Sequence, residues 1–320
     1  MHIFGLINKD SGPGFHRVMM PLLMMPGADV YITNNIKEED FEERRPGIIF
    51  YSRVISDEIL LLRNKYQCKL VLDVDDYWRL DPHHIAYETY MQNNLEALQI
   101  KHLHIADIVT TTHERLAEKI YPHNKNVVIL PNAIPNHEYF EVEKTGSERL
   151  RLFWQGSITH EKDIEMLRYP IKRLDKNKYL AVMAGYTKHE VWDRMVAAYT
   201  NGLQLPGCIL HGLPPQEYYG NYKYADVCLA PLLDTPFNSL KSNLKILEAA
   251  HAGVPVIASH VQPYINLPVL YAHKQTDWIK NIHELSDEKA RAQIGQQLKA
   301  YCATHYNFDT INKKRKECFE

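Results

Sequence analysis

The sequence has no long hydrophobic run, few cysteines and no dinucleotide-binding glycine motif. No stretch approaches the roughly 20 consecutive apolar residues that a transmembrane helix needs, which argues against an integral membrane protein. The five cysteines are odd in number and include no CxxC pair, so neither a disulfide framework nor a zinc or redox motif is expected. The N-terminal segment MHIFGLINKDSGPG lacks the basic and long apolar regions of a secretory signal. We therefore expect a cytoplasmic protein, with peripheral attachment at the inner membrane face as the alternative.

The composition is that of a globular protein with two domains. Of the 320 residues, 45% are hydrophobic and 24% are charged, which excludes a disordered chain. At about 150 residues per domain, this length predicts two domains. Residues 1–150 hold 16 Lys and Arg against 22 Asp and Glu, a net charge of −6, whereas residues 151–320 hold 21 against 17, a net charge of +4. The second half is therefore the expected host of a phosphate-bearing ligand, and a broad nucleic-acid surface on the first half is disfavoured.

Short β-branched runs alternate with helix-like segments in both halves, which predicts parallel sheets with helical crossovers. In the first half the predicted strands are Met1–Ile7, Asp29–Thr33, Gly47–Tyr51, Lys69–Val74, Ile108–Thr112 and Val127–Leu130. In the second half they are Leu150–Trp154, Tyr179–Ala184, Cys208–His211, Asp226–Pro231, Val254–Ala258 and Val269–Tyr271.

A polar, glycine-containing segment, Glu141–Arg149, is the best candidate for a linker between two doubly wound α/β domains. We expect an N-terminal domain over residues 1–145, a C-terminal domain over 146–300, and a last helix over 301–320 that packs back on the N-terminal domain. Ligands of such sheets bind beyond the carboxyl ends of the strands. The expected active site is therefore a central cleft that the two domains face.

The first candidate segment is the turn Ser11-Gly12-Pro13-Gly14, which lies between a predicted strand and a helix-like run from Phe15. Such a turn lets a ligand approach the backbone closely, and the following helix N-terminus can bind an anion. The spacing is not GxGxxG, so the dinucleotide fingerprint is absent. We expect Gly14 to contact a donor and His16 and Arg17 to contact an acceptor, with an ordinary tight turn as the alternative.

The second segment, Asp73-Val74-Asp75-Asp76-Tyr77-Trp78, crowds three carboxylates at the end of a predicted buried strand. Like charges at this spacing require a cation, a basic partner or a raised pKa. Asp75 and Asp76 are candidates for general-base work, and Tyr77 and Trp78 for acceptor binding. Helix capping with solvated charges, or a Mg²⁺ site, are the alternatives.

Two further segments combine a strand end, a helix start and basic residues. In WQGSITHEKD, Gly156 and Ser157 follow a strand, and His160 and Lys162 lie in the first helical turn, where they oppose the helix dipole unless an anion is present. Ordinary helix capping is the alternative. In the other of these two segments, Ser242 or Asn243 is expected to cap a helix flanked by Lys241 and Lys245, an arrangement suited to a diphosphate. Glu248 lies on the same face and could accept hydrogen bonds from a ribose diol.

The segment that contains Ser242 extends from Phe237 to Ser259 and ends LEAAHAGVPVIAS. It resembles glycosyltransferases of the two-Rossmann-domain GT-B type, close to family 4. WQGSITHEKD resembles the loop after the first strand of their nucleotide-binding domain, and VVILPNAI the stretch before their linker. The family's glutamate pair keeps only Glu248, because the first position is Leu240, and its glycine-arginine pair reads Gly156-Ser157. The string Lys241-Ser242-Asn243-Leu244-Lys245 is similar to a variant bacterial and phage branch.

The resemblance implies transfer of a sugar from a UDP- or GDP-sugar to an acceptor hydroxyl, with retention and with neither a cofactor nor a metal. It assigns donor binding to the loops and helix start described above: Gly14, Gly156, Ser157, Lys162, Lys241, Ser242, Asn243, Leu244, Lys245 and Glu248. It places Asp75, Asp76, His160 and Lys162 in the catalytic group. The acceptor is a glycan, a lipid-linked sugar or, in the phage alternative, a hydroxymethylated DNA base. Two functions compete with sugar transfer: a sugar-nucleotide epimerase and a catalytically silent binding protein, the second because Leu240 replaces a glutamate.

Two histidine pairs and a basic run have simpler interpretations. His83-His84 and His102-Leu103-His104 show no third ligand at short spacing, so we expect no metal there. The run Lys313-Lys314-Arg315-Lys316 is typical of a solvated helix end, with contact to nucleic acid or an anionic membrane as the alternative.

Overall fold

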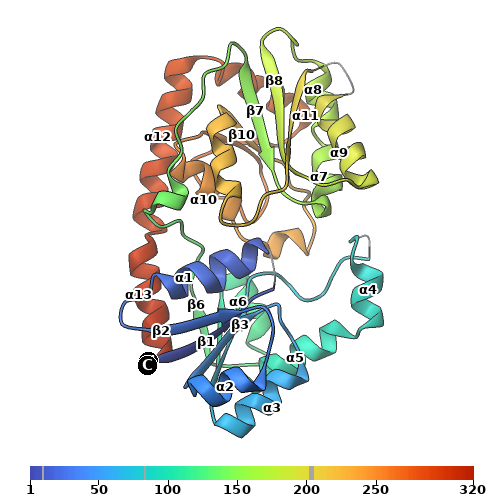
Figure 1. The fold of residues 1–320 in the computed structure, drawn as a ribbon. Coiled ribbons are helices and arrows are strands. Elements are labelled where there is room, and N and C mark those ends of the chain that lie inside the picture. The colour runs from blue at the N-terminus through green and yellow to red at the C-terminus, as the bar shows by residue number, and fades with distance from the viewer. Residues whose placement is uncertain (9–10, 83, 202–204) are drawn as a thin grey trace. The chain divides into compact units, whose positions relative to one another are not determined.

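The computed structural model describes residues 1–8, 11–82, 84–201 and 205–320. They divide into two compact units (Figure 1). Unit 1 comprises Met1–Ala133, Leu240–Ser242 and Phe308–Glu320, and unit 2 comprises Ile134–Ser239 and Asn243–Asn307. Each unit is built on one six-stranded parallel sheet with helices on both faces, so the predicted doubly wound α/β class is confirmed. The boundaries expected at residues 145 and 300 stay predictions.

The sheet of unit 1 has the strand order β2-β1-β3-β4-β5-β6. The strand order reverses between β1 and β3, which is the point where ligands of such sheets bind, beyond the carboxyl ends of the strands. The strands are β1 (His2–Leu6), β2 (Asp29–Thr33), β3 (Ile48–Ser52), β4 (Lys69–Val74), β5 (Ile108–Thr111) and β6 (Val127–Ile129). All six lie where the sequence predicts strands.

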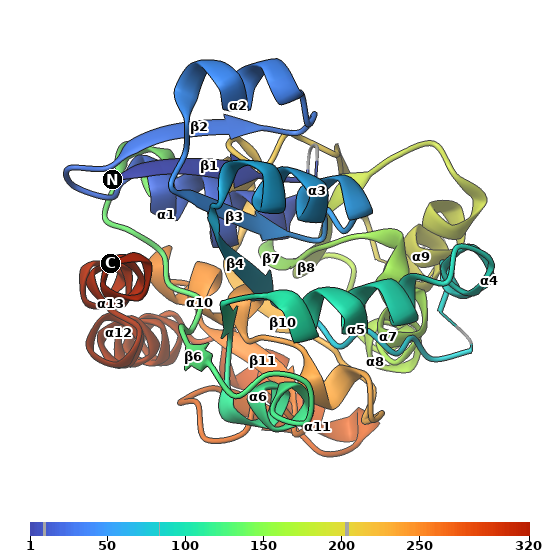
Figure 2. The ribbon, with the colours of Figure 1, turned by 90° about the horizontal axis from the view of Figure 1, so that it is seen from below.

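Helices cover both faces of this sheet (Figure 2). One face packs on α2, α3, α5 and α6, and the other on η1, α1 and α13. β3 and β4 read as nearly continuous apolar runs because both of their faces are buried. The helices are the π-helix η1 (Gly14–Met19), α1 (Met20–Leu23), α2 (Glu38–Arg44), α3 (Asp57–Tyr66), α4 (Tyr87–Gln92), α5 (Leu95–Ile105), α6 (Glu114–Ile120) and α13 (Phe308–Phe319).

The sheet of unit 2 has the order β12-β11-β10-β7-β8-β9, with its reversal between β7 and β10. Its strands also match the predicted ones: β7 (Leu150–Gln155), β8 (Tyr179–Tyr186), β9 (Gly207–His211), β10 (Val227–Ala230), β11 (Val256–Ser259) and β12 (Leu270–Ala272). One face carries α7, α8, α9 and α11, and the other carries α10 and α12 (Figure 1). The helices are η2 (Glu138–Phe140), η3 (Ile158–His160), α7 (Glu161–Glu165), α8 (Arg168–Lys172), α9 (Glu190–Thr200), η4 (Tyr218–Tyr224), η5 (Asn238–Leu240), α10 (Leu244–His251), α11 (Gln275–Glu284) and α12 (Glu288–His305).

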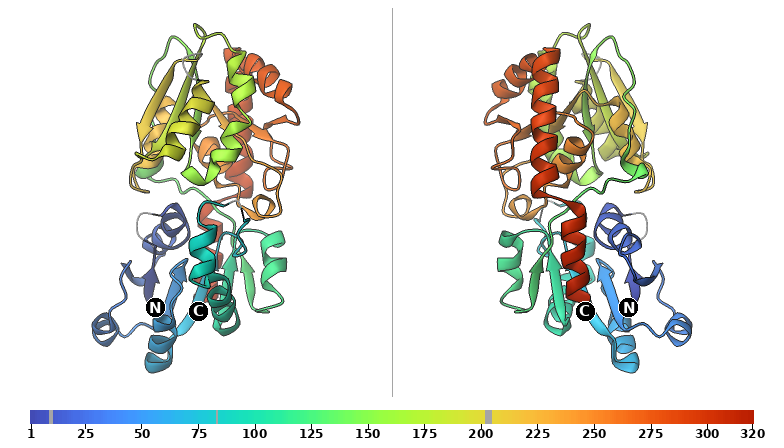
Figure 3. Two further views of the ribbon diagram at one scale, coloured as in Figure 1. Left: turned by 90° about the vertical axis from the view of Figure 1, so that its right-hand side faces the viewer. Right: turned by 90° about the vertical axis from the view of Figure 1, so that its left-hand side faces the viewer.

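The last helix, α13, is part of unit 1 and packs on its sheet (Figure 3). The ring centroids of Phe319 and Phe50 are 5.1 Å apart. Asn312 donates to the carbonyl oxygen of Pro21 at 2.9 Å. The expectation of a solvated basic run is wrong for Arg315, whose side chain is buried and donates to Asn312. Burial, together with the charge of the neighbouring Arg17, lowers the pKa of Arg315 to about 9. Within the described residues, no helix is long and apolar enough to cross a membrane.

Candidate active site

In unit 2 the strand-order reversal is bordered by the carboxyl end of β7, where Gln155 is followed by Gly156. A Cβ atom on Gly156 would lie 2.6 Å from the ring of the buried Trp154, so only glycine fits. At the end of β8, Gly185 has a φ of +106°, and a Cβ there would lie 2.3 Å from the Gly156 carbonyl oxygen. These two glycines let the loop after β7 pack closely against the end of β8.

Helix α10 brings Lys245 to the same strand end. Asn243 is the N-cap residue of α10, and its side chain makes no capping hydrogen bond to the first turn. The ammonium of Lys245 donates to the carbonyl oxygen of Gln155 and lies 4.7 Å from the centre of the Trp154 ring. A helix N-terminus with a lysine in its first turn is suited to a phosphate group. Unit 2 therefore places Asn243, Leu244 and Lys245 at the edge where its sheet is expected to bind a ligand.

Glu248 lies one turn further along α10 and is buried, with 5% of its surface exposed. Its carboxylate accepts hydrogen bonds from the hydroxyls of Tyr218 and Tyr222, the second at 3.2 Å. Burial raises the pKa of both tyrosines well above the usual value, and the Glu248 charge raises it further, so both remain protonated donors. The sequence analysis did not identify these two tyrosines, which both lie in η4.

The loop after β7 also orients His160. Its Nδ1 contacts the Asp163 carboxylate at 2.7 Å, and the other oxygen of Asp163 accepts from the Leu233 backbone N–H at 2.8 Å. Because the carboxylate accepts, the proton of a neutral His160 ring lies on Nδ1. The hydroxyls of Ser157 and Thr159 contact one another at 2.7 Å, and Lys162 is exposed on α7.

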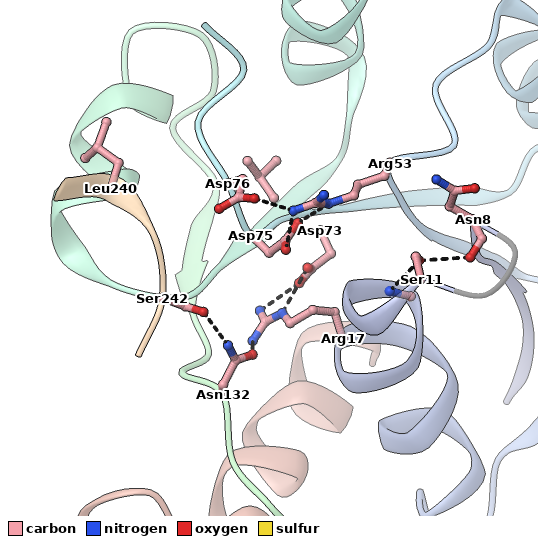
Figure 4. Close-up of polar contacts among 12 residues, drawn as sticks. Asn8, Ser11, Arg17, Arg53, Asp73, Asp75, Asp76, Asn132, Leu240 and Ser242 are labelled. Carbon is pink, nitrogen blue, oxygen red and sulfur yellow. Dashed lines mark hydrogen bonds and ion pairs between the residues drawn. The ribbon is translucent and has the colours of Figure 1, made fainter. Parts of the chain in front are cut away.

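In unit 1 the acidic segment begins within the last residues of β4, and its first carboxylate is structural (Figure 4). Asp73 and Arg17 are 2% and 1% exposed, and they form a bidentate ion pair with distances of 3.0 and 2.8 Å. Thr110 also donates to Asp73, at 2.6 Å. Arg17, expected to contact an acceptor, is therefore fully engaged in the interior of unit 1.

The other two carboxylates, Asp75 and Asp76, share one basic partner. Arg53 directly follows β3 in a left-handed conformation, with a φ of 58°. Its guanidinium donates to both oxygens of Asp75 at 2.8 and 2.7 Å and to Asp76 at 2.5 Å (Figure 4). Burial raises the pKa of Asp75, while the charge of Arg53 acts against this rise. The basic partner that the sequence required is thus Arg53, which the sequence analysis missed although it lies two residues after the predicted strand Gly47–Tyr51.

Asp75→Asn and Asp76→Asn are expected to impair sugar transfer and to leave nucleotide affinity nearly unchanged, because both residues belong to unit 1 rather than to the nucleotide-suited edge of unit 2. Transfer rates and calorimetric titration with nucleotide measure the two effects. An asparagine retains an oxygen that can accept from Arg53, so local structure is kept. A collapse of nucleotide affinity would instead assign these carboxylates to the donor site or to a metal.

The remaining expected residues of unit 1 differ in exposure. Trp78 is 5% exposed and belongs to the hydrophobic core, where its ring lies 5.1 Å from that of the half-buried Tyr77. His16 is 4% exposed. The backbone N–H of Gly14 donates to the Ser11 hydroxyl at 3.1 Å, as an ordinary turn would require.

Of the two residues expected to cap α10, Ser242 or Asn243, the structure has Asn243 at the N-cap position. The Ser242 hydroxyl instead accepts from Asn132 at 2.9 Å, and both Lys241 and Ser242 belong to unit 1. Lys245 and Glu248, which the sequence analysis also expected to bind the donor, belong to unit 2.

The described residues contain no group of three or more His, Cys, Asp or Glu side chains that could hold a metal ion. His102 contacts the Tyr51 hydroxyl at 2.8 Å, and His104 contacts His123 at 3.4 Å. His83 lies outside the described residues.

Comparison with known proteins agrees with this geometry. Residues 149–290 match the family model described as glycosyl transferases group 1. The chain carries a glycosyltransferase domain. The matched range contains the whole nucleotide-suited edge of unit 2, including Gly156, Lys245 and Glu248. The prediction of a glycosyltransferase is thereby confirmed, whereas membership of family 4 stays a prediction. No curated protein sequence matches the chain significantly.

Solved glycosyltransferase structures share the fold over the full chain. HepE from Anabaena, solved with UDP and glucose, is 13% identical, with 98% of each chain covered and a TM-score of 0.66. Sucrose-phosphate synthase from Thermosynechococcus elongatus is 15% identical, with 100% of this chain and 98% of that chain covered and a TM-score of 0.71. An α-glucosyltransferase solved with UDP and a 13-mer DNA containing an HMU base is 10% identical, with 100% and 99% covered and a TM-score of 0.63. At these identities the likeness establishes the GT-B fold of the glycosyltransferase.

Proposed function

We propose that this glycosyltransferase moves a sugar from a UDP- or GDP-sugar to an acceptor hydroxyl in the synthesis of a glycan or surface polysaccharide. The observation that carries the proposal is the edge of unit 2, where Lys245, the N-terminus of α10 and Glu248 lie together. The lysine and the helix N-terminus bind the diphosphate, and Glu248 accepts hydrogen bonds from the ribose diol. HepE was solved with UDP and glucose, which supports a uridine nucleotide as the first donor to test.

The leaving group determines which residues of this site matter for the reaction. When the glycosidic bond breaks, negative charge develops on the distal phosphate of the nucleoside diphosphate. Cationic groups and helix N–H groups that face this charge lower the barrier without a metal ion. Lys245 and Lys162 supply the cations in unit 2, and Lys241 in unit 1. The proposed acceptor-side residues of unit 1 are Asp75, Asp76 and Tyr77. Arg17 and Trp78 are buried beside this segment, Arg17 in the ion pair with Asp73 and Trp78 in the hydrophobic core.

A panel of nucleotide sugars tests the proposal directly. The protein is incubated with UDP- and GDP-hexoses and with glycan, lipid-linked and hydroxymethylated DNA acceptors, and the products are identified by mass spectrometry. A mass increase of one sugar residue on an acceptor supports transfer. Conversion of the donor to an isomer without acceptor would indicate an epimerase. Nucleotide binding with neither reaction would indicate a binding protein.

The transfer is expected to proceed with retention of anomeric configuration and to persist in excess EDTA. Retention follows from the resemblance to family 4, in which the departing phosphate can take the acceptor proton. NMR of the first-formed product determines the configuration. A product of opposite configuration would mean inversion, with Asp75 or Asp76 as the general base. Loss of activity in EDTA, restored by Mg²⁺ or Mn²⁺, would show that a metal supplements the lysines.

A further inference from the structure

A three-residue segment, Leu240–Ser242, belongs to unit 1 although the chain on both sides of it belongs to unit 2. Leu240 is 4% exposed and is part of the hydrophobic core of unit 1, together with Leu116 and Trp78. The residue that replaces the family's first glutamate is therefore a buried apolar anchor (Figure 4). Two polar side chains, His113 and Asn132, hold the same segment, and neither residue belongs to the donor or catalytic groups discussed so far.

The first contact comes from His113, the N-cap residue of α6. Its Nδ1 accepts a hydrogen bond from the backbone N–H of Leu116 at 3.3 Å, so in the neutral ring the proton lies on Nε2. The Nε2 atom lies 3.1 Å from the carbonyl oxygen of Leu240 and 3.1 Å from that of Lys241, so its N–H can donate to both. Burial lowers the pKa of His113, with the two carbonyl contacts acting against this, so the neutral form that makes both contacts is favoured at pH 7. One imidazole thus joins α6 to the segment before α10.

The second contact comes from Asn132, which is 5% exposed. Its amide nitrogen donates to the Ser242 hydroxyl at 2.9 Å, and its amide oxygen accepts from Arg17 at 3.1 Å. Arg17 also donates to the carbonyl oxygen of Leu130 at 2.7 Å and forms the buried ion pair with Asp73. Because every member of this chain of contacts is buried or half-buried, it fixes the position of Ser242 relative to the end of β4.

We propose that His113 and Asn132 are positioning residues that hold Leu240–Ser242 in the conformation needed to bind the donor diphosphate. The inference rests on the proposed function, since it assumes that Lys241 and Ser242 contact the phosphates. Ser242 lies two residues before the first residue of α10. Ordering this segment in advance removes an entropic cost that donor binding would otherwise include.

His113→Asn removes the contact to the two carbonyl oxygens, and Asn132→Ala removes the donor to Ser242 together with the acceptor for Arg17. Asparagine is a strong N-cap residue, so His113→Asn keeps the cap of α6 but is too short to reach the two carbonyls. The matched control Asn132→Asp keeps an acceptor for Arg17 and can accept a hydrogen bond from the Ser242 hydroxyl. It is therefore expected to hold Ser242 as the unmodified protein does, unlike the alanine variant. Thermal unfolding checks that each variant is folded.

Cleavage by trypsin after Lys241 measures the anchor without any ligand. Release of one hydrogen bond is expected to raise the cleavage rate at Lys241 about fivefold in His113→Asn and in Asn132→Ala. Cleavage after Lys119, in α6, is expected to stay unchanged and reports that the cap is intact. An unchanged cleavage rate at Lys241 would contradict the claim that His113 and Asn132 hold Leu240–Ser242 in place, whichever nucleotide the protein binds.

Titrations with UDP and with uridine then test positioning, with GDP and guanosine as the parallel pair. The two variants are expected to bind the nucleoside diphosphate about fivefold more weakly and the nucleoside unchanged, because only the phosphates depend on Leu240–Ser242. Faster cleavage with unchanged diphosphate affinity, or equal losses for both ligands, would overturn the positioning role. Absence of nucleotide binding in the unmodified protein would overturn the proposed function and the positioning role with it, whereas the cleavage result would still decide the anchor.

Discussion

Replacing Lys245 with alanine is expected to lower kcat for sugar transfer by about 100-fold or more, with a smaller rise in donor KM. The Lys245 ammonium is held at the end of β7 by the carbonyl oxygen of Gln155 and by the face of the Trp154 ring. Charge on the leaving diphosphate grows as the glycosidic bond breaks, so a fixed cation stabilises the transition state more than the bound donor. Removing one such group from an enclosed site typically costs about 10²–10³ in kcat.

Three variants make this result interpretable. Lys245→Arg retains the charge and is expected to recover part of the rate. Lys176→Ala removes an exposed lysine near the amino end of β8 and is expected to have no effect. Lys241→Ala is expected to weaken donor binding by about tenfold, in the usual range for a charge-assisted contact. A pure rise in KM for Lys245→Ala, with kcat unchanged, would mean that the lysine binds the donor uniformly and does not assist departure.

Glu248→Ala is expected to raise donor KM by about 10- to 100-fold, as for lost hydrogen bonds to a charged group, and Glu248→Gln by only a few-fold. Glutamine keeps an oxygen to which a ribose hydroxyl can donate, whereas alanine offers no partner. The alanine variant also leaves the hydroxyls of Tyr218 and Tyr222 without their acceptor, so it is expected to lower the free energy of unfolding by about 1–3 kcal/mol. Steady-state kinetics and urea denaturation measure the two effects separately.

The tyrosines provide the control for Glu248. Tyr222→Phe removes one donor to the carboxylate and leaves its charge in place, so a modest rise in KM is expected if the tyrosine orients Glu248. Equal effects of Glu248→Ala and Glu248→Gln on KM would instead indicate that the negative charge itself is required. That outcome would contradict a role limited to accepting hydrogen bonds from the ribose.

Local pattern was sufficient for the strands but not for all the helices. The β-branched runs predicted the strands of both sheets because strand formation in a fully covered sheet depends on short apolar segments. Helices α2, α4, α5 and α9 were not predicted. Helix α4 contains no buried residue, so it has no apolar stripe from which a helical period could be recognised. Helix α5 carries the HxH motif, and its His102 packs in the interior against Tyr51 rather than on a metal.

The sequence by itself determined the α/β class, the strand-end loops and the expectation that Lys245 and Glu248 serve a nucleotide sugar. These depend on residues close in the chain, such as a glycine after a strand or a lysine at a helix start. Only the tertiary structure decided which partners the charged groups have: Arg53 for Asp75 and Asp76, Arg17 for Asp73, and two tyrosines for Glu248. It also decided that Leu240 and Ser242 pack with unit 1. Such pairings join residues about 20 to more than 100 positions apart. Burial makes the Arg17–Asp73 pair and the acceptor role of Glu248 energetically obligatory once the sheet order is set.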